Sequence, residues 1–422
     1  MTYREIHNEE LEQVTDVVGR AFRFDGAAFA QRMREGQHRY DARNARVWAE
    51  AGQVVAALFT YQRDLTVSGA MLPAGLVGLV SVPPEQRRRG YAHRLMSALL
   101  QEFYAAGLPI SLLYPYDIDF YRRLGYGIVN EAWYLELPLD QLSDFDEMRR
   151  VVRLDSDDLP KMEALFEQER SQRNGWLSRR KAEWIGRLLP DPADGGAWPR
   201  QREMVGLPDG DGGLSGYLIY TLAPVENPPA RGGATPRELH VYEWVSATDE
   251  AWRALAGFVA AQRAQADFLR YTAPVDFPLP YAVRNRTTYR DLRQSEFCFR
   301  DMFSWTAGLM GRLIDWPTAL RKRGWPTQLT GQTVLQMDDP LFPANNVPLA
   351  VRWAAGRATV QPSDDPATAR ADVSTWSELY AGTLSPRVAR LLGRLDADEP
   401  TIALLDQAFA CDPWFLPSAD WF

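Results

Sequence analysis

Three consecutive arginines followed by a glycine are the residues of this 422-residue sequence that point most directly to chemistry. Arg87, Arg88 and Arg89 precede Gly90, and Ala92 follows, after an apolar stretch and at the start of a helix-like pattern. A helix N-terminus already carries partial positive charge and unpaired N–H groups, so three cations there repel one another unless an anion binds. Gly90 permits the close backbone approach that a pyrophosphate needs. The pattern predicts an anion-binding loop, with a solvated basic loop as the alternative for the three arginines alone.

The elements that must position this loop favour the anion site. Hydrophobic periodicity predicts an α/β unit with a central sheet. Its elements are helices at 9–22, 27–33 and 90–104, strands at 46–50, 53–61, 76–82 and 110–114, and a helical turn at 120–124. The order along the chain is therefore a buried strand, the arginine loop, a helix, a further strand and an aromatic turn.

Two further units are predicted beyond an acid-rich boundary at 140–158. The second has helices at 158–172, 178–188 and 249–266, strands at 214–222 and 238–246, and loops at 190–213 and 224–236, in an order that echoes the first unit. The third is α+β, with helices at 305–314, 317–323, 374–381, 386–392 and 401–410 and strands at 327–337, 347–354 and 357–362. The aromatic residues of 412–422 indicate a packed end of the chain.

Composition excludes several classes of protein. There are 47 basic and 55 acidic residues, a net charge of −8, which disfavours a general nucleic-acid binder. Cys298, Cys411 and four scattered histidines have no metal-ligand spacing, so we expect no metal. The uncharged stretch 65–84 contains three prolines and three glycines and is better explained as paired strands than as a membrane helix. The charged start MTYREIHNEE argues against a secretion signal, and we expect a cytoplasmic protein without a membrane partner.

The arginine loop and the aromatic turn together resemble a known signature. The acetyl-CoA motif of the GNAT acyltransferases is similar to this part of the chain. The shared features are Arg/Gln-x-x-Gly-x-Gly/Ala after an apolar strand, followed here by FYRRLGY at 120–126. Five segments extend this resemblance to the Eis family of N-acetyltransferases over essentially the whole chain. They are VSVPPEQRRRGYAHRLM, LLYPYDIDFYRRLGYG, DMFSWTAGLMGRLIDWPTALRKRGW, LYAGTLSPRVARLLGRL and the aromatic C-terminus.

The resemblance implies a domain layout and an assembly. We expect a catalytic GNAT domain at 1–148, a second, degenerate GNAT-like domain without its own cofactor site at 149–298, and a sterol-carrier-protein-like domain at 299–422. The motif Arg/Gln-x-x-Gly-x-Gly/Ala does not recur between 150 and 298, which agrees with a second domain that binds no cofactor. The family also implies a homo-hexamer.

The same resemblance implies roles for individual residues. Acetyl-CoA is the expected co-substrate, with its pantetheine along the backbone of Val80 and Val82. Its pyrophosphate is expected on the arginine loop, at Arg87, Arg88, Arg89, Gly90 and Ala92. Tyr121 aligns with the general acid that protonates the departing thiolate, with simple core packing as the alternative. Tyr126 is expected to pack in the core.

A general base must take a proton from the acceptor amine, and the strand 79–82 lacks the glutamate that some GNAT enzymes place there. In the Eis family the α-carboxylate of the chain enters the catalytic domain, and here that group belongs to Phe422. Its ordinary pKa of about 3.5 makes it a weak base, so position and desolvation would have to help it. Glu85 is the second candidate, and a purely structural tail is the alternative role of Phe422.

Acceptor contacts are predicted at Phe24, Asp25 and Asp420, whose aromatic and acidic side chains suit a cationic amine, and Tyr116 is expected to narrow the acceptor pocket. The prediction is an acetyl-CoA-dependent N-acetyltransferase acting on an aminoglycoside-like or polyamine-like amine or a lysine side chain. The alternative is a non-catalytic protein that senses CoA or carries a hydrophobic ligand.

Overall fold

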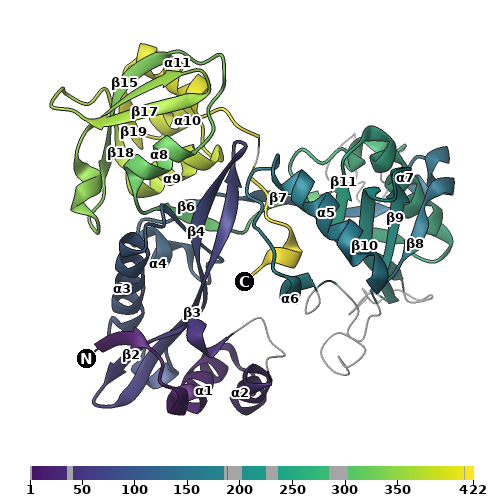
Figure 1. Ribbon diagram of the computed structural model, residues 1–422, viewed down its shortest axis with the longest axis horizontal. Coiled ribbons are helices and arrows are strands. Elements are labelled where there is room, and N and C mark those ends of the chain that lie inside the picture. Colours follow the sequence, from purple (N-terminus) through teal and green to yellow (C-terminus); the bar gives the residue numbers. More distant parts are fainter. Residues whose placement is uncertain are drawn as a thin grey trace, which may run out of the picture.

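The computed structural model describes residues 2–35, 41–184, 188, 202–224, 236–284, 303–412 and 414–422. Within these residues the chain forms three sheets, each covered by helices, and the last residues lie between the units (Figure 1). The mixed α/β and α+β architecture agrees with the sequence-based expectation. The predicted limit at 298/299 and Cys298 lie outside the described residues.

The first sheet carries the arginine loop. Its strands, in spatial order, are β1 (Thr2–Glu5), β2 (Ala45–Glu50), β3 (Gln53–Val67), β4 (Ala70–Ser81), β5 (Ile110–Leu113), β14 (Met310–Leu313) and β6 (Gly127–Ile128). Its helices are α1 (Leu11–Phe22), α2 (Gly26–Arg34), α3 (Tyr91–Ala105) and α4 (Ile118–Arg122).

Alternation along β3 explains how helices cover both faces of this sheet. Ala57 and Phe59 pack in one hydrophobic cluster with α1, whereas Ala56 and Leu58 pack in another with α3. Successive side chains of a strand point to opposite faces, so an almost continuous apolar strand is buried on both sides. The uncharged stretch 65–84 is the hairpin of β3 and β4, as expected of paired strands.

Taken from β8 to β13, the second sheet repeats the pairing pattern of the first, in which only the fourth and fifth strands are parallel. Its strands, in spatial order, are β13 (Phe303–Ala307), β7 (Glu131–Pro138), β12 (Phe268–Pro274), β11 (Arg237–Ser246), β10 (Leu214–Pro224), β9 (Glu203–Pro208) and β8 (Val152–Leu154). Its helices are α5 (Leu159–Arg170), α6 (Lys181–Glu183) and α7 (Asp249–Ala261). β4 and β5 pair in parallel before and after α3, and β11 and β12 do the same around α7.

The third unit is a sheet with helices and matches the predicted meander. Its strands, in spatial order, are β17 (Arg357–Pro362), β16 (Leu349–Ala354), β15 (Gly331–Asp338), β18 (Ala369–Asp372) and β19 (Leu395–Ala397). Its helices are α8 (Trp316–Lys322), α9 (Val373–Ala381), α10 (Pro386–Leu391) and α11 (Glu399–Ala408).

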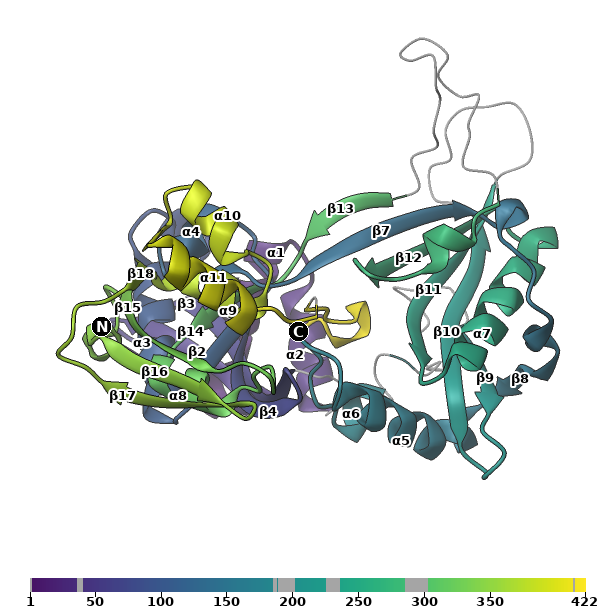
Figure 2. The ribbon, with the colours of Figure 1, turned by 90° about the horizontal axis from the view of Figure 1, so that it is seen from above.

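The predicted helix at 305–314 is wrong, because this segment forms two strands in two different sheets. β13 pairs with β7 in the second sheet, and β14 fills the space between β5 and β6 in the first. The partners are more than 160 residues away in the sequence, so local periodicity carries no sign of them. The sheets therefore do not follow the predicted domain limits residue by residue. The whole of β7 lies before the predicted limit at 148, yet it belongs to the second sheet (Figure 2).

None of the described helices combines the length and the apolar character needed to cross a membrane. Over the same residues, no three His, Cys, Asp or Glu side chains gather as a set of metal ligands.

A buried ion pair fastens the third unit to the first sheet. Arg312 of β14 donates through Nη2 to Oδ1 of Asp339, 2.7 Å away, and both side chains are fully buried. Its Nε donates to the carbonyl oxygen of Leu124 at 2.6 Å. The neighbouring carboxylate of Asp338 pairs with Arg370 at the surface, where both side chains are about half exposed.

We therefore expect Asp339→Asn to lower the free energy of unfolding by about 3–5 kcal/mol, because it leaves the Arg312 charge buried and unpaired. Asp338→Asn, the matched control, should cost less than about 1 kcal/mol because water screens an exposed pair. Urea unfolding followed by tryptophan fluorescence measures both, and equal effects of the two substitutions would contradict the argument.

Candidate active site

The parallel strands β4 and β5 separate within the first sheet, which leaves a split between them. Their parallel pairing ends at Val77 opposite Leu113. On the other side, the pairing of β4 with β3 shifts register beyond Gly78, and Leu79 adopts φ 51° in the left-handed region. A bulge of this kind leaves backbone groups outside the ladder and bends the strand. Val80, where pantetheine is predicted, is half-buried and lies at this split.

The arginine loop follows β4 and leads into α3, as predicted. A 3₁₀ turn (Pro84–Gln86) connects them, and Gly90 is the N-cap of α3 with φ 79° and no atom within 4 Å of the place a Cβ would take. Among the described residues, no acceptor binds the backbone N–H groups from 88 to 93. Open space beside unpaired donors is what a phosphate group needs.

The side chains of the loop lie in solvent, where an anion can reach them. Arg87, Arg88 and Arg89 are exposed, and none forms an ion pair with a carboxylate within the described part of the chain. Arg87 donates through Nε to the carbonyl oxygen of Val82 at 3.4 Å, so that carbonyl is already engaged. Ala92 is half-buried in the first turn of α3. The predicted pyrophosphate residues therefore form one continuous cationic loop.

Tyr121 lies on the α3 face of the same split. It is 6% exposed and packs in one cluster with Val77 and Leu113. Burial, with a smaller contribution from the charge of Asp117, raises the pKa of Tyr121 to about 12. No described residue hydrogen-bonds its hydroxyl, whereas the hydroxyl of Tyr126 bonds Ser111 Oγ at 2.7 Å in the core. Tyr126 is thus a packing residue, and Tyr121 keeps an unused donor.

Phe422 reaches the split from the opposite face. Its carboxyl carbon lies 3.4 Å from the point that a Cβ on Gly78 would occupy. Gly78 pairs with Phe59, whose side chain faces α1, and cross-strand neighbours share a face of the sheet. Tyr114 directly follows β5 and packs against both last residues. Its ring centroid lies 5.7 Å from that of Phe422 and 5.0 Å from that of Trp421. Sequence reasoning missed Tyr114, although it directly follows a buried strand.

The segment that carries Phe422 is anchored in the second unit. Asp420 accepts two hydrogen bonds from the guanidinium of Arg179, at 2.6 and 2.7 Å, and the same guanidinium also pairs with Glu243. All three side chains are almost completely buried. Upstream, Phe415 N–H donates to the carbonyl of Asn174 at 3.1 Å. Figure 2 shows this last segment between the first and second units.

Other predicted residues have structural roles instead. Asp420 is 3% exposed and paired with Arg179, which gives its carboxylate a structural partner, and its contact with the acceptor stays a prediction. Asp25 caps α2 by accepting from the N–H groups of residues 27 and 28, and the Phe24 ring packs edge-on against Phe29. Within the described part of the chain, no hydrogen bond, ion pair or ring contact joins Asp25 or Phe24 to Phe422.

The surroundings of Glu85 and Tyr116 do not favour their expected roles. Glu85 pairs with Arg20 at 2.7 Å, and its own backbone N–H and Arg20 lower the pKa of its carboxyl, which weakens it as a base. Tyr116 is 96% exposed, and its expected narrowing of the acceptor pocket stays a prediction.

Comparison with known families agrees with the three units. Residues 2–129 and 175–300 each match an acetyltransferase (GNAT) domain, and residues 316–417 match a sterol carrier protein domain. An uncharacterized N-acetyltransferase of Streptomyces coelicolor is 26% identical over 329 residues, covering 74% of this chain and 72% of that protein. A second one, from Streptomyces avermitilis, is 25% identical, with 72% and 70% covered.

Solved structures share the whole fold. A GCN5-related N-acetyltransferase from Anabaena variabilis superimposes with a TM-score of 0.84 at 22% identity, and both chains are covered completely. Eis1 from Mycobacterium abscessus gives a TM-score of 0.78 at 21% identity, again with complete coverage of both chains.

We expect Asp420→Asn to loosen the end of the chain, because it removes one charged partner of a buried guanidinium. Charge-assisted hydrogen bonds contribute about 1.5–3 kcal/mol, so the open population of the tail should rise roughly tenfold or more. Carboxypeptidase A should then release Phe422 correspondingly faster. Asp412→Asn is the control, because the carboxylate of Asp412 is exposed on the same segment. An unchanged release rate for Asp420→Asn would mean that Arg179 does not hold the tail.

Proposed function

We infer that this chain, which belongs to the Eis-like N-acetyltransferases with two GNAT domains followed by a sterol carrier protein domain, transfers acetyl from acetyl-CoA directly to an amine of a cationic acceptor. The observation that carries the proposal is the carboxyl group of Phe422 against Gly78, at the split between β4 and β5. Tyr121 stands on the other face of the same split. An acid and a base thus flank the place where an extended thioester would add to β4.

The residues present fit acetyl-CoA. Unpaired N–H groups at the start of α3, the open space beside Gly90 and three exposed arginines suit a pyrophosphate. The bulged backbone at Leu79 and Val80 suits the extended pantetheine amides. Acetyl-CoA supplies the activated acetyl group, and the chain supplies its orientation.

The acceptor amine must lose a proton before or during its attack on the thioester carbon. We propose that the Phe422 carboxylate takes this proton, directly or through a water molecule. A carboxylate has an ordinary pKa of about 3.5, which makes it a weak base, so the group would have to act through its position against Gly78. Its negative charge also attracts a cationic acceptor, which an aminoglycoside-like or polyamine-like amine or a lysine side chain would provide.

The departing sulfur gains negative charge as the carbon–sulfur bond breaks. We assign Tyr121 to donate a hydrogen bond and then its proton to that sulfur. Burial keeps the hydroxyl protonated at any pH below about 12, so the donor is present throughout the range of an assay. The proton lost by the amine and the proton gained by sulfur balance the reaction, and the products are an N-acetylated amine and CoA. The homo-hexamer remains a prediction from the family resemblance.

We expect Tyr121→Phe to lower kcat by about 10²–10⁴-fold, the usual contribution of a general acid, with little change in the KM for acetyl-CoA. Release of CoA thiol is measured against a panel of polyamines, aminoglycosides, lysine peptides and aryl amines, with an acceptor-free blank for the protein thiols. Tyr116→Phe is the matched control, because the Tyr116 ring is in solvent. A Tyr121→Phe enzyme with wild-type kcat would remove Tyr121 from the mechanism.

Extending the chain by one residue after Phe422 tests the base. The extension keeps the Phe422 ring but moves the carboxylate away from Gly78, and a misplacement of about 1 Å can already cost roughly 10²-fold in rate. We therefore expect kcat to fall by about that factor while acetyl-CoA binding, measured by calorimetry, is retained. A one-residue extension at the N-terminus is the control. Full activity of the C-terminally extended enzyme would exclude the carboxylate as the base.

A further inference from the structure

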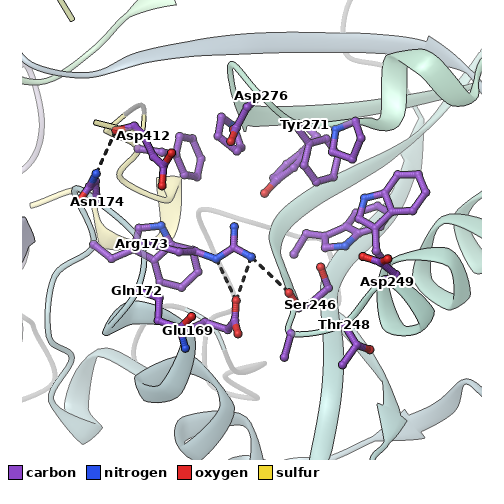
Figure 3. A pocket seen from close by; sticks show the side chains of 18 of the residues that line it. Glu169, Gln172, Arg173, Asn174, Ser246, Thr248, Asp249, Tyr271, Asp276 and Asp412 are labelled. Carbon is purple, nitrogen blue, oxygen red and sulfur yellow. Dashed lines mark hydrogen bonds and ion pairs between the residues drawn. The ribbon is translucent and has the colours of Figure 1, made fainter. Parts of the chain in front are cut away.

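A pocket of about 630 Å³ opens in the second unit, away from the split between β4 and β5. It lies where β11 and β12 end and α7 begins, and the segment around Asp412 and Phe415 closes one side (Figure 3). The parallel pairing of β11 with β12 ends at Val241 opposite Tyr271, so the pocket occupies the split that corresponds to the active site of the first unit.

The charge of this second split is reversed. Where α3 follows three arginines, α7 follows Thr248, whose hydroxyl caps the N–H of Ala251 at 3.1 Å. Asp249 and Glu250 then stand in the first turn of α7. The cap and the two carboxylates satisfy the positive end of the helix, so a phosphate group has no place there.

Carboxylates without cationic partners surround the pocket. The side chains of Asp249, Asp276 and Asp412 are exposed and form no ion pair with any described residue. The two arginines in the lining are already engaged, since Arg173 binds Glu169 at 2.9 Å and Arg253 binds Glu147, outside the lining, at 2.7 Å. The pocket therefore has a surplus of negative charge.

The floor of the pocket is aromatic. Trp244, Tyr271 and Phe277 are each more than nine-tenths buried, and their ring centroids lie 5.2–6.4 Å apart. The hydroxyl of Tyr271 is directed into the pocket and has no hydrogen-bond partner among the described residues (Figure 3). The buried indole N–H of Trp244 likewise lacks an acceptor. The Tyr271 oxygen can face a cationic ligand, whereas the Trp244 N–H needs an acceptor, such as a water molecule.

We propose that this pocket binds an organic ammonium ion, with its alkyl groups on the aromatic floor and its charge balanced by Asp249, Asp276 and Asp412. Aromatic faces attract cations through the ring quadrupole, and quaternary ammonium ligands are recognised by such clusters of rings. The cationic ligand explains both the surplus of carboxylates and their position at the rim. This site does not depend on the acid and base assigned to the first unit.

Choline is a suitable probe because its quaternary nitrogen has no proton to exchange for an acetyl group. Calorimetry without acetyl-CoA should detect saturable choline binding to the wild-type chain. The neutral isostere 3,3-dimethylbutan-1-ol should bind at least about tenfold more weakly, since only the charge differs. Absence of saturable choline binding, or equal binding of the isostere, would overturn the proposal.

The double substitution Asp249→Asn and Asp276→Asn should weaken choline binding about tenfold or more. Asp157→Asn with Asp211→Asn is the matched control, because it removes two exposed carboxylates elsewhere in the second unit. Circular dichroism verifies that both variants are folded. Choline binding that is unchanged in the Asp249/Asp276 variant would place the ligand elsewhere and overturn the proposal.

Discussion

The architecture of the candidate active site depends on the ion pairs of the Arg179 guanidinium. It holds Asp420, two residues before Phe422, together with Glu243 of β11, in a setting from which water is excluded. Tyr217 donates its hydroxyl to Glu243 at 2.8 Å and so shares the excess negative charge. Burying such ions is costly, but removing any one of them costs more because the others remain. The second unit, which lacks the arginine loop, thus fixes the end of the chain against the first unit.

The chain builds the same strand split twice and gives the two copies opposite charge. In the first, exposed arginines and an open glycine face the end of β4. In the second, Thr248 and Asp249 occupy the corresponding turn, and the floor is aromatic. The two splits therefore share a backbone geometry but differ in the charge and the aromatic content of the side chains around them.

Much of this organisation could be predicted from local pattern. The arginine loop at the start of α3 and the strands around it need only neighbouring residues to be recognised. The segment 303–314 could not be assigned, because β13 and β14 exist only through partners on β7, β5 and β6. Asp420 was assigned to the acceptor because nothing in the sequence pairs it with Arg179, 241 residues earlier. The approach of Phe422 to the sheet rested on family resemblance, since no spacing argument reaches from one unit to another.

The insertion of β14 between β5 and β6 has a consequence for synthesis. When the ribosome has completed β6, the first sheet still has a gap between β5 and its edge strand β6, and the residues that fill it have not been made. The nascent chain must keep two unpaired strand edges apart from other chains while the whole second unit emerges. The N-terminal GNAT unit is therefore expected to be late to fold, and holdase chaperones have a long interval in which to bind it.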